Sequence, residues 1–141
     1  KDIIKFMNKK ILIVVADYYK EISSNLLDGA KKTIEDNNNN FTFDIIKAPG
    51  CFEIPFLIKK NINKFDGFIA LGCIIRGETY HFELIANECS NKIMQLSTEF
   101  IKPIGFGILT CENIEQAIQR SHPNKGNKGH EAANACLYLL D

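Results

Sequence analysis

The chain has 141 residues, with 17 Lys and Arg against 17 Asp and Glu, so its formal net charge at pH 7 is +0. This length suits a single domain with one core, and an apolar content of 45% with 24% charged residues argues against a disordered chain. A net charge of zero also argues against extended electrostatic binding to nucleic acid or to an anionic membrane, although it is compatible with a local basic pocket.

The cysteines and the hydropathy of the chain indicate its compartment. Five cysteines are widely spaced and form no C-x-x-C pair: Cys51, Cys73, Cys89, Cys111 and Cys136. A zinc site or a disulfide scaffold has a different spacing, so reduced thiols fit best. No segment is long and uncharged enough to span a bilayer, and the first residues carry no long apolar run. We therefore expect a soluble, cytoplasmic protein with no membrane or nucleic-acid partner.

Apolar runs and helical periodicity alternate along the chain. Short β-branched runs predict strands buried on both faces of a parallel sheet, and apolar residues three or four positions apart predict amphipathic helices. The predicted elements are, in chain order, a strand at 10–16, a helix carrying 22–34, a strand at 41–46, a helix at 53–64, a strand at 67–75, a helix carrying 82–96, a strand at 103–110, and helices at about 113–120 and 129–140.

This alternation predicts βαβ units with right-handed crossovers. We expect a single-domain, doubly wound (flavodoxin-like) α/β fold, in which a four-stranded parallel sheet carries helices on both faces. Residues 1–9 are expected to form an N-terminal arm, with Ile3, Ile4 and Phe6 as a short edge strand paired with a neighbouring subunit. Residues 10–141 then form the α/β domain.

Ligands of open parallel sheets bind outside the carboxyl ends of the strands, and residues 76–82 follow the third predicted strand at the start of a helix. Gly77 lets an anion approach the unpaired N–H groups of that helix, and Thr79 is placed to cap it. His81 is placed in the first turn of the same predicted helix, where its imidazole is suited to proton transfer. A capped helix with an incidental histidine is an equally weighted alternative.

A second segment, residues 48–55, follows the second predicted strand. Phe52 is suited to stack on a planar ring, and Glu53 is suited to bond hydroxyls or ring nitrogens. Packing of Phe52 in the core, with Glu53 favouring the helix dipole, is the stronger reading of this stretch alone. Cys51 has no neighbouring base in the sequence, so inert filling is expected of it.

A third segment combines Arg120 with the polar run 124–129. The guanidinium of Arg120 ends a predicted helix, where it favours the dipole, and it is also suited to clamp a phosphate through two hydrogen bonds. The polar run fits a solvated turn equally well. Because all three segments follow strands, we expect them to meet in space as a pocket for a phosphate and a flat ring with an imidazole between them.

Four stretches of sequence resemble the lumazine synthase family in order and spacing: residues 49–55, 70–82, 106–110 and 115–120. The resemblance runs from about Lys10 to the C-terminus. It implies the penultimate step of riboflavin biosynthesis, the condensation of 5-amino-6-(D-ribitylamino)uracil with 3,4-dihydroxy-2-butanone 4-phosphate, without a cofactor or metal. It also implies a homopentamer with sites at the subunit interfaces, sometimes assembled into a sixty-subunit shell.

The resemblance also implies roles for single residues. His81 takes the place of the proton-transfer histidine, and Arg120 that of the phosphate-binding arginine; these are the two expected catalytic residues. The remaining substrate-binding positions are Tyr18 for stacking, Cys51, Phe52, Glu53 and Ile54 for the pyrimidine and ribityl chain, Cys73, Ile74 and Ile75 at the strand end, Gly77, Glu78 and Thr79 for the phosphate, and Phe106 and Lys128 from the neighbouring subunit.

Three departures from the family pattern stand out. Tyr18 occupies a position where Phe or Trp is common, and Cys51 one that is usually filled by a small residue. Residues 121–125 differ from the turn of icosahedral members, which leaves the assembly size open. Three alternative functions remain: an archaeal-type riboflavin synthase, a flavin- or phosphate-binding module without catalysis, and a structural shell protein. The first acts on a substrate without phosphate, and the second leaves the histidine without a role.

Overall fold

Four parallel strands form one sheet in the order β2-β1-β3-β4. The computed structural model describes residues 8–37, 40–77 and 81–141, and the predicted edge strand at Ile3, Ile4 and Phe6 lies outside them. The elements are β1 (Lys9–Ala16), α2 (Lys20–Asp36), β2 (Phe41–Ala48), the 3-10 turn η1 (Cys51–Glu53), α3 (Ile54–Lys60), β3 (Gly67–Ile75), α4 (His81–Phe100), β4 (Ile104–Cys111), α5 (Ile114–Ser121) and α6 (Lys128–Leu140).

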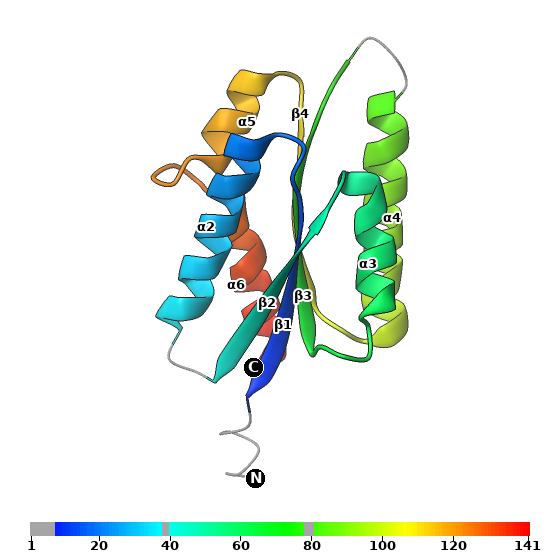
Figure 1. Ribbon diagram of the computed structural model, residues 1–141, viewed down its shortest axis with the longest axis vertical. Coiled ribbons are helices and arrows are strands. Elements are labelled where there is room, and N and C mark those ends of the chain that lie inside the picture. The colour runs from blue at the N-terminus through cyan, green and yellow to red at the C-terminus, as the bar shows by residue number, and fades with distance from the viewer. Residues whose placement is uncertain (1–7, 38–39, 78–80) are drawn as a thin grey trace.

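Helices cover both faces of the sheet (Figure 1): α2, α5 and α6 lie on one face, and α3 and α4 on the other. The inner strands β1 and β3 have buried side chains on both faces, because successive residues point to opposite sides of a strand. Ile13 and Leu71 therefore pack under α2 and α6, whereas Val14 and Ala70 pack under α3 and α4. The predicted doubly wound α/β fold is confirmed.

The helix predicted over residues 53–64 is shorter than expected. A 3-10 turn precedes α3, Pro55 lies in its first turn as predicted, and the helix ends at Lys60. Asn61 ends it, because its side-chain amide donates to the Leu57 carbonyl at 2.8 Å and its backbone leaves helical geometry. The chain then turns, so that Ile62 returns to the core.

Helix α6 lies unusually close to the edge strand β4. A Cβ atom on Gly105 would meet the Ala132 carbonyl oxygen at 2.0 Å, so a glycine is required at this crossing. This close packing brings the start of α6 alongside β4 and so places Lys128 beside that edge of the sheet. None of the helices in the described ranges combines the length and the hydropathy that a membrane span requires.

Candidate functional site

A hollow of about 370 Å³ opens at the carboxyl ends of the strands, where the strand order reverses around β1 and β3. This is where open α/β sheets bind their ligands, and the volume suits a small molecule. We call it the ring hollow, and it is lined by Tyr18, Tyr19, Gly50, Cys51, Phe52, Glu53, Cys73, Ile74, Ile75, His81 and Ile85. The loops after β1 and β2, the end of β3 and the start of α4 all contribute.

Two aromatic rings stand at the ring hollow without being part of the core. Tyr18 is 74% exposed and meets Tyr19 edge-on, with ring centroids 4.9 Å apart, and Phe52 is 55% exposed. The alternative that Phe52 packs in the core is therefore wrong. Large aromatic faces left in water are suited to stacking on a planar heterocycle.

The floor of the ring hollow is apolar, and the cysteine thiols in it keep their protons. Burial raises the pKa of the Cys51 and Cys73 thiols to about 12. The Cys51 thiol points at the Cys73 carbonyl at 4.0 Å, and the buried Cys89 thiol donates to the Cys51 carbonyl at 3.2 Å. These thiols fill space and hold η1 in place, which agrees with the inert role expected of Cys51.

The polar groups of the ring hollow come from helix starts. His81 is the first residue of α4 and is exposed, and Glu53 directly precedes α3 with its side chain exposed and making no capping hydrogen bond. Gly77 is exposed, and a Cβ atom placed on it would meet nothing within 4 Å. Glu78 and Thr79, predicted to cradle phosphate, lie outside the described residues. An imidazole and a carboxylate thus face the same cavity as the aromatic rings.

Sequence reasoning missed three lining residues of the ring hollow. Tyr19 and Ile85 contribute side chains to the wall, and Gly50 contributes backbone. The helical period was a usable signal for Ile85, which lies one turn after His81 on the same helix face. Ile54, predicted to bind substrate, is fully buried and does not line the ring hollow.

A second hollow, of about 350 Å³, lies along the edge strand β4. Arg120 in the last turn of α5 and Lys128 at the start of α6 make it cationic, and Lys128 pairs with Glu131 at 3.6 Å. A guanidinium beside an ammonium is suited to bind a phosphate. We call it the anion hollow; its lining residues are Phe106, Ile108, Leu109, Thr110, Arg120, Gly126, Lys128 and Glu131.

The predicted site residues therefore fall into two groups. The ring hollow contains Tyr18, the η1 residues, the end of β3 and His81, whereas the anion hollow contains Phe106, Arg120 and Lys128. Within the described residues of one chain, no residue lines both. We expected all three predicted segments to meet. In a single copy, residues of the segments 48–55 and 76–82 line one hollow, whereas Arg120 and Lys128 line the other.

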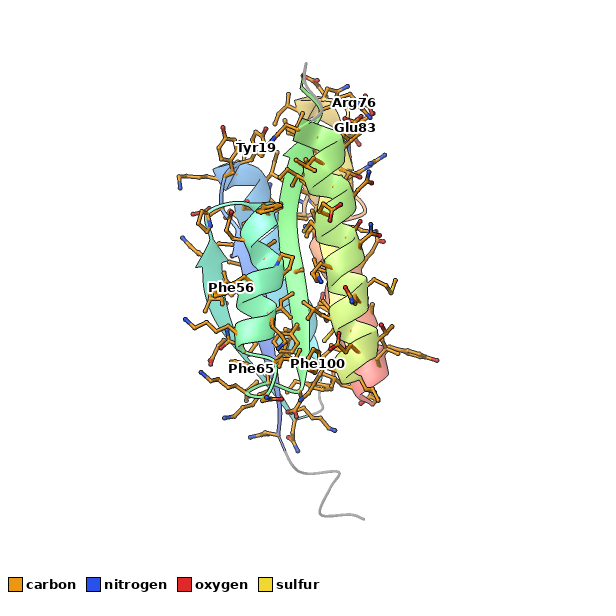
Figure 2. The ribbon with its side chains drawn as sticks, turned by 90° about the vertical axis from the view of Figure 1, so that its right-hand side faces the viewer. Tyr19, Phe56, Phe65, Arg76, Glu83 and Phe100 are labelled. Atoms are coloured by element: carbon orange, nitrogen blue, oxygen red, sulfur yellow. The ribbon has the colours of Figure 1, made fainter. Side chains whose placement is uncertain are left out.

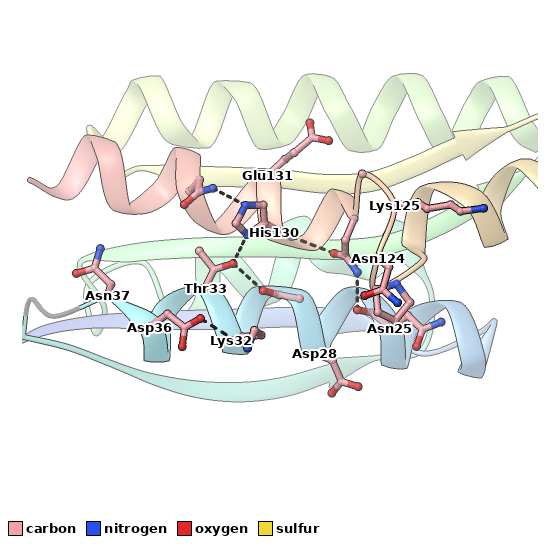
Figure 3. Close-up of a pocket in the computed structure, with 15 residues that line it drawn as sticks. Asn25, Asp28, Lys32, Thr33, Asp36, Asn37, Asn124, Lys125, His130 and Glu131 are labelled. Carbon is pink, nitrogen blue, oxygen red and sulfur yellow. Dashed lines mark hydrogen bonds and ion pairs between the residues drawn. The ribbon is translucent and has the colours of Figure 1, made fainter.

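A third hollow, of about 680 Å³, lies elsewhere, between α2 and α6 (Figure 3). Its polar groups bond one another: the Thr33 hydroxyl lies 2.6 Å from His130 Nδ1, and the Asn134 amide lies 3.0 Å from His130 Nε2. It is a polar cleft between two helices, and of the three predicted segments it contains only residues 124–127 of the polar run. In the parts of the chain that the structure describes, no three His, Cys, Asp or Glu side chains gather as metal ligands.

Fold and hollows define a flavodoxin-like α/β protein with a candidate small-molecule site at the strand switch point. A sequence profile of the 6,7-dimethyl-8-ribityllumazine synthase family matches residues 8–141. The chain is 44% identical to the 6,7-dimethyl-8-ribityllumazine synthase of Bartonella tribocorum over 141 residues, which cover 96% of this chain and 92% of that protein. Over 138 residues it is 44% identical to the enzyme of that name from Blochmanniella pennsylvanica, with 94% and 86% covered.

A third relative with the same name, from Ruthia magnifica, is 42% identical over 141 residues, which cover 93% of this chain and 83% of that protein. The chain belongs to the 6,7-dimethyl-8-ribityllumazine synthase family, as the order of its motifs predicts. It is an enzyme, a transferase of lumazine synthesis in riboflavin biosynthesis.

Proposed function

We propose that this enzyme condenses 5-amino-6-(D-ribitylamino)uracil with 3,4-dihydroxy-2-butanone 4-phosphate, in the cytoplasm, to give 6,7-dimethyl-8-ribityllumazine, phosphate and water. The observation that carries this proposal is the ring hollow, in which exposed aromatic rings, a carboxylate and the His81 imidazole line one cavity at the strand switch point. A flat polar heterocycle needs aromatic faces for its ring, and its edge needs hydrogen-bonding groups.

The pyrimidine substrate occupies the ring hollow. Tyr18 and Phe52 cover the faces of its ring, and Glu53 with the N–H groups of the following turn bonds its polar edge and hydroxyls. Cys51, Cys73 and Ile74 form a dry floor below it. A water-excluding floor strengthens the polar contacts at the rim.

The phosphate substrate is held by the anion hollow of a second copy. Arg120 and Lys128 provide the charge, with Phe106 beside them, and Gly77 to Thr79 of the first copy close the cradle. This places each site between two subunits, in a homopentamer or in a shell of pentamers. Exposed apolar side chains on the two helices that cover one face of the sheet support self-association: Phe56 on α3 is 67% exposed, and Leu84 on α4 is 56% exposed.

The N-terminal arm is part of the same proposal, with Ile3, Ile4 and Phe6 adding an edge strand to a neighbouring subunit, whereas Lys9 already belongs to β1. The strand β2 lies at the edge of the sheet, so its outer backbone groups are available for such a strand.

The chemistry of the reaction consists mainly of proton movements. The substrate amine attacks the ketone carbon, and a first water leaves as the imine forms. Phosphate is then eliminated, and after tautomerisation the ribitylamino nitrogen attacks the second carbonyl and closes the ring with loss of a second water. His81 takes and returns protons at the reacting nitrogen and carbon atoms, a role that contributes about 10²–10⁴-fold. Holding the two substrates together contributes about 7–11 kcal/mol in favourable cases, so we expect orientation to outweigh the imidazole.

A two-substrate assay tests this function. When both substrates are mixed with the protein, we expect lumazine fluorescence and inorganic phosphate to appear together in equal amounts. Omission of either substrate should abolish both signals. Lumazine consumption without any need for the phosphate substrate would instead indicate a riboflavin synthase, and tight flavin binding without turnover would indicate a carrier.

A further inference from the structure

Arg76 joins three elements at the rim of the ring hollow. It directly follows β3, and its backbone N–H donates to the Cys111 carbonyl at the end of β4, at 2.9 Å. Its Nε donates to the Glu112 carboxylate at 2.9 Å, and its Nη1 donates to the Glu83 carboxylate. Figure 2 shows Arg76 and Glu83 beside one another at the upper end of α4.

The guanidinium of Arg76 also stacks on an aromatic ring. Its Cζ atom lies 4.4 Å from the ring centroid of Phe82, which is buried under the helix. Phe82 and Glu83 both belong to the first turn of α4, and that turn begins with His81. One side chain therefore fixes the turn through a flat stacking contact and an ion pair at the same time.

The geometry needs an arginine at this position. The planar fork of the guanidinium serves two carboxylates in different directions while its face covers Phe82, whereas an ammonium is a single point of charge. Arg76 and Glu83 are each 41% exposed, and isolated pairs at such exposure stabilise proteins little. A role in overall stability is therefore a poor explanation for this cluster, and a local role is a better one.

A local role is available at this helix start. The first turn of a helix lacks backbone partners for its N–H groups and tends to fray. The imidazole of His81 projects from this turn into the ring hollow. A misplacement of a catalytic group by about 1 Å costs a reaction up to about 10²-fold, so a device that fixes the turn affects turnover directly.

We propose that Arg76 is a positioning residue, which clamps the first turn of α4 to the ends of β3 and β4 and thereby sets the place of the His81 imidazole. This inference rests on the proposed function of His81. The Arg76 guanidinium contacts Glu83 and Phe82 in the first turn of α4. It also bonds Glu112, which lies in the segment between β4 and α5.

Steady-state kinetics of Arg76→Met test the clamp. We expect kcat to fall about tenfold while the KM of the pyrimidine substrate changes less than about twofold, because Tyr18, Phe52 and Glu53 stay in place and the imidazole does not. Glu83→Gln should lower kcat in the same direction by less, and Arg76→Lys should recover only part of the loss. Lys32→Met, which removes a surface pair with Asp36 far from the ring hollow, is the matched control and should leave turnover unchanged.

A double variant separates positioning from a general structural effect. If Arg76 acts through His81, then Arg76→Met combined with His81→Ala should turn over no more slowly than His81→Ala alone. Losses that multiply in the double variant would overturn the inference. So would an Arg76→Met variant with unchanged kcat.

Amide hydrogen exchange tests the clamp without using activity. The amides of residues 85–87 bond to carbonyls of the first turn of α4, and we expect them to exchange about tenfold faster in Arg76→Met. The amides of residues 93–96 in the same helix should keep their rates. Unchanged exchange at 85–87 would refute the clamp, whereas a missing two-substrate reaction in the unmodified protein would refute only the proposed function.

Discussion

The thiols of this chain act as small hydrophobic side chains. All five cysteines are free and buried. The Cys51 sulfur takes the space that a side chain at residue 72 would need, since a Cβ atom on Gly72 would meet it at 2.6 Å. Burial raises the pKa of Cys51, Cys73 and Cys136 to about 12, so these groups carry no thiolate near neutral pH.

Alkylation should reveal this protonated state. At pH 8 we expect iodoacetamide to react with Cys51 and Cys73 about a thousandfold more slowly in the folded protein than in urea, because the thiolate is the reactive form. Mass spectrometry of the labelled peptides measures both rates. The folded protein binds these protons more tightly than the unfolded chain, so the stability they contribute is present below pH 9 and is lost as pH rises towards 12. Labelling of the folded protein at the rate found in urea would contradict this account.

The placement of some residues at the site was predictable from the sequence, and that of others was not. The position of His81 at a helix start was predictable, because a glycine-containing loop follows an apolar strand there. The exposure of Phe52 was not, because an aromatic residue next to a helix start is usually part of the core and only the short turn η1 turns it outward. Local pattern alone does not show on which side of a turn a ring lies.

Among the elements, Asn127 joins three helices. It is 8% exposed, and its Oδ1 accepts from the His130 N–H at 3.0 Å as the N-cap of α6. Its Nδ2 donates to the Asn25 carbonyl in α2 at 3.0 Å and to the Ser121 carbonyl at the end of α5 at 2.9 Å. Arg120 lies one residue before that carbonyl and Lys128 directly follows Asn127, so this joint also holds the anion hollow in shape.

Truncation of Asn127 should therefore destabilise the protein more than the loss of an ordinary cap. We expect Asn127→Ala to lower the free energy of unfolding by roughly 2–4 kcal/mol, since a cap is lost and the buried Ser121 carbonyl and the half-buried Asn25 carbonyl lose their donor. Asn113→Ala is the matched control, because exposed Asn113 caps α5 through one bond at 2.9 Å; it should cost about 1 kcal/mol. Urea unfolding measures both, and equal costs would count against the joint.

The boundaries of elements show where local sequence stops being informative. The strands and most helices follow from periodicity, because each buries its apolar side against the sheet. The role of Asn127 depends on a carbonyl 102 residues away in sequence, and no local pattern predicts such a contact. The early end of α3 depends on the competing side chain of Asn61, which is a local signal and was available in the sequence.

At the scale of the whole molecule, the fold separates the two halves of the proposed site. The alternation of strands and helices was sufficient to predict the parallel sheet and its binding edge. It did not show that Arg120 lies with β4 and α6 in a hollow distinct from that of His81. That separation follows from α5 and α4 lying on opposite faces of the sheet (Figure 1).

Single variants in the two hollows should change different kinetic parameters. Arg120→Ala should chiefly raise the KM of the phosphate substrate, because it removes a charge that binds the anion. His81→Ala should chiefly lower kcat, by the 10²–10⁴-fold or less that one general acid and base supplies. At subsaturating phosphate substrate both variants are therefore nearly inactive when assayed alone.

Mixing these two variants tests the shared site most directly. If each site joins the ring hollow of one copy to the anion hollow of another, subunits of His81→Ala and Arg120→Ala unfolded together and reassembled in equal amounts form some sites with both groups intact. Random assembly makes about one quarter of the sites complete, so activity at subsaturating phosphate substrate should recover to about that fraction of the unmodified protein. Activity that stays at the mean of the two separate variants would show that His81 and Arg120 act within one chain, and would contradict the account.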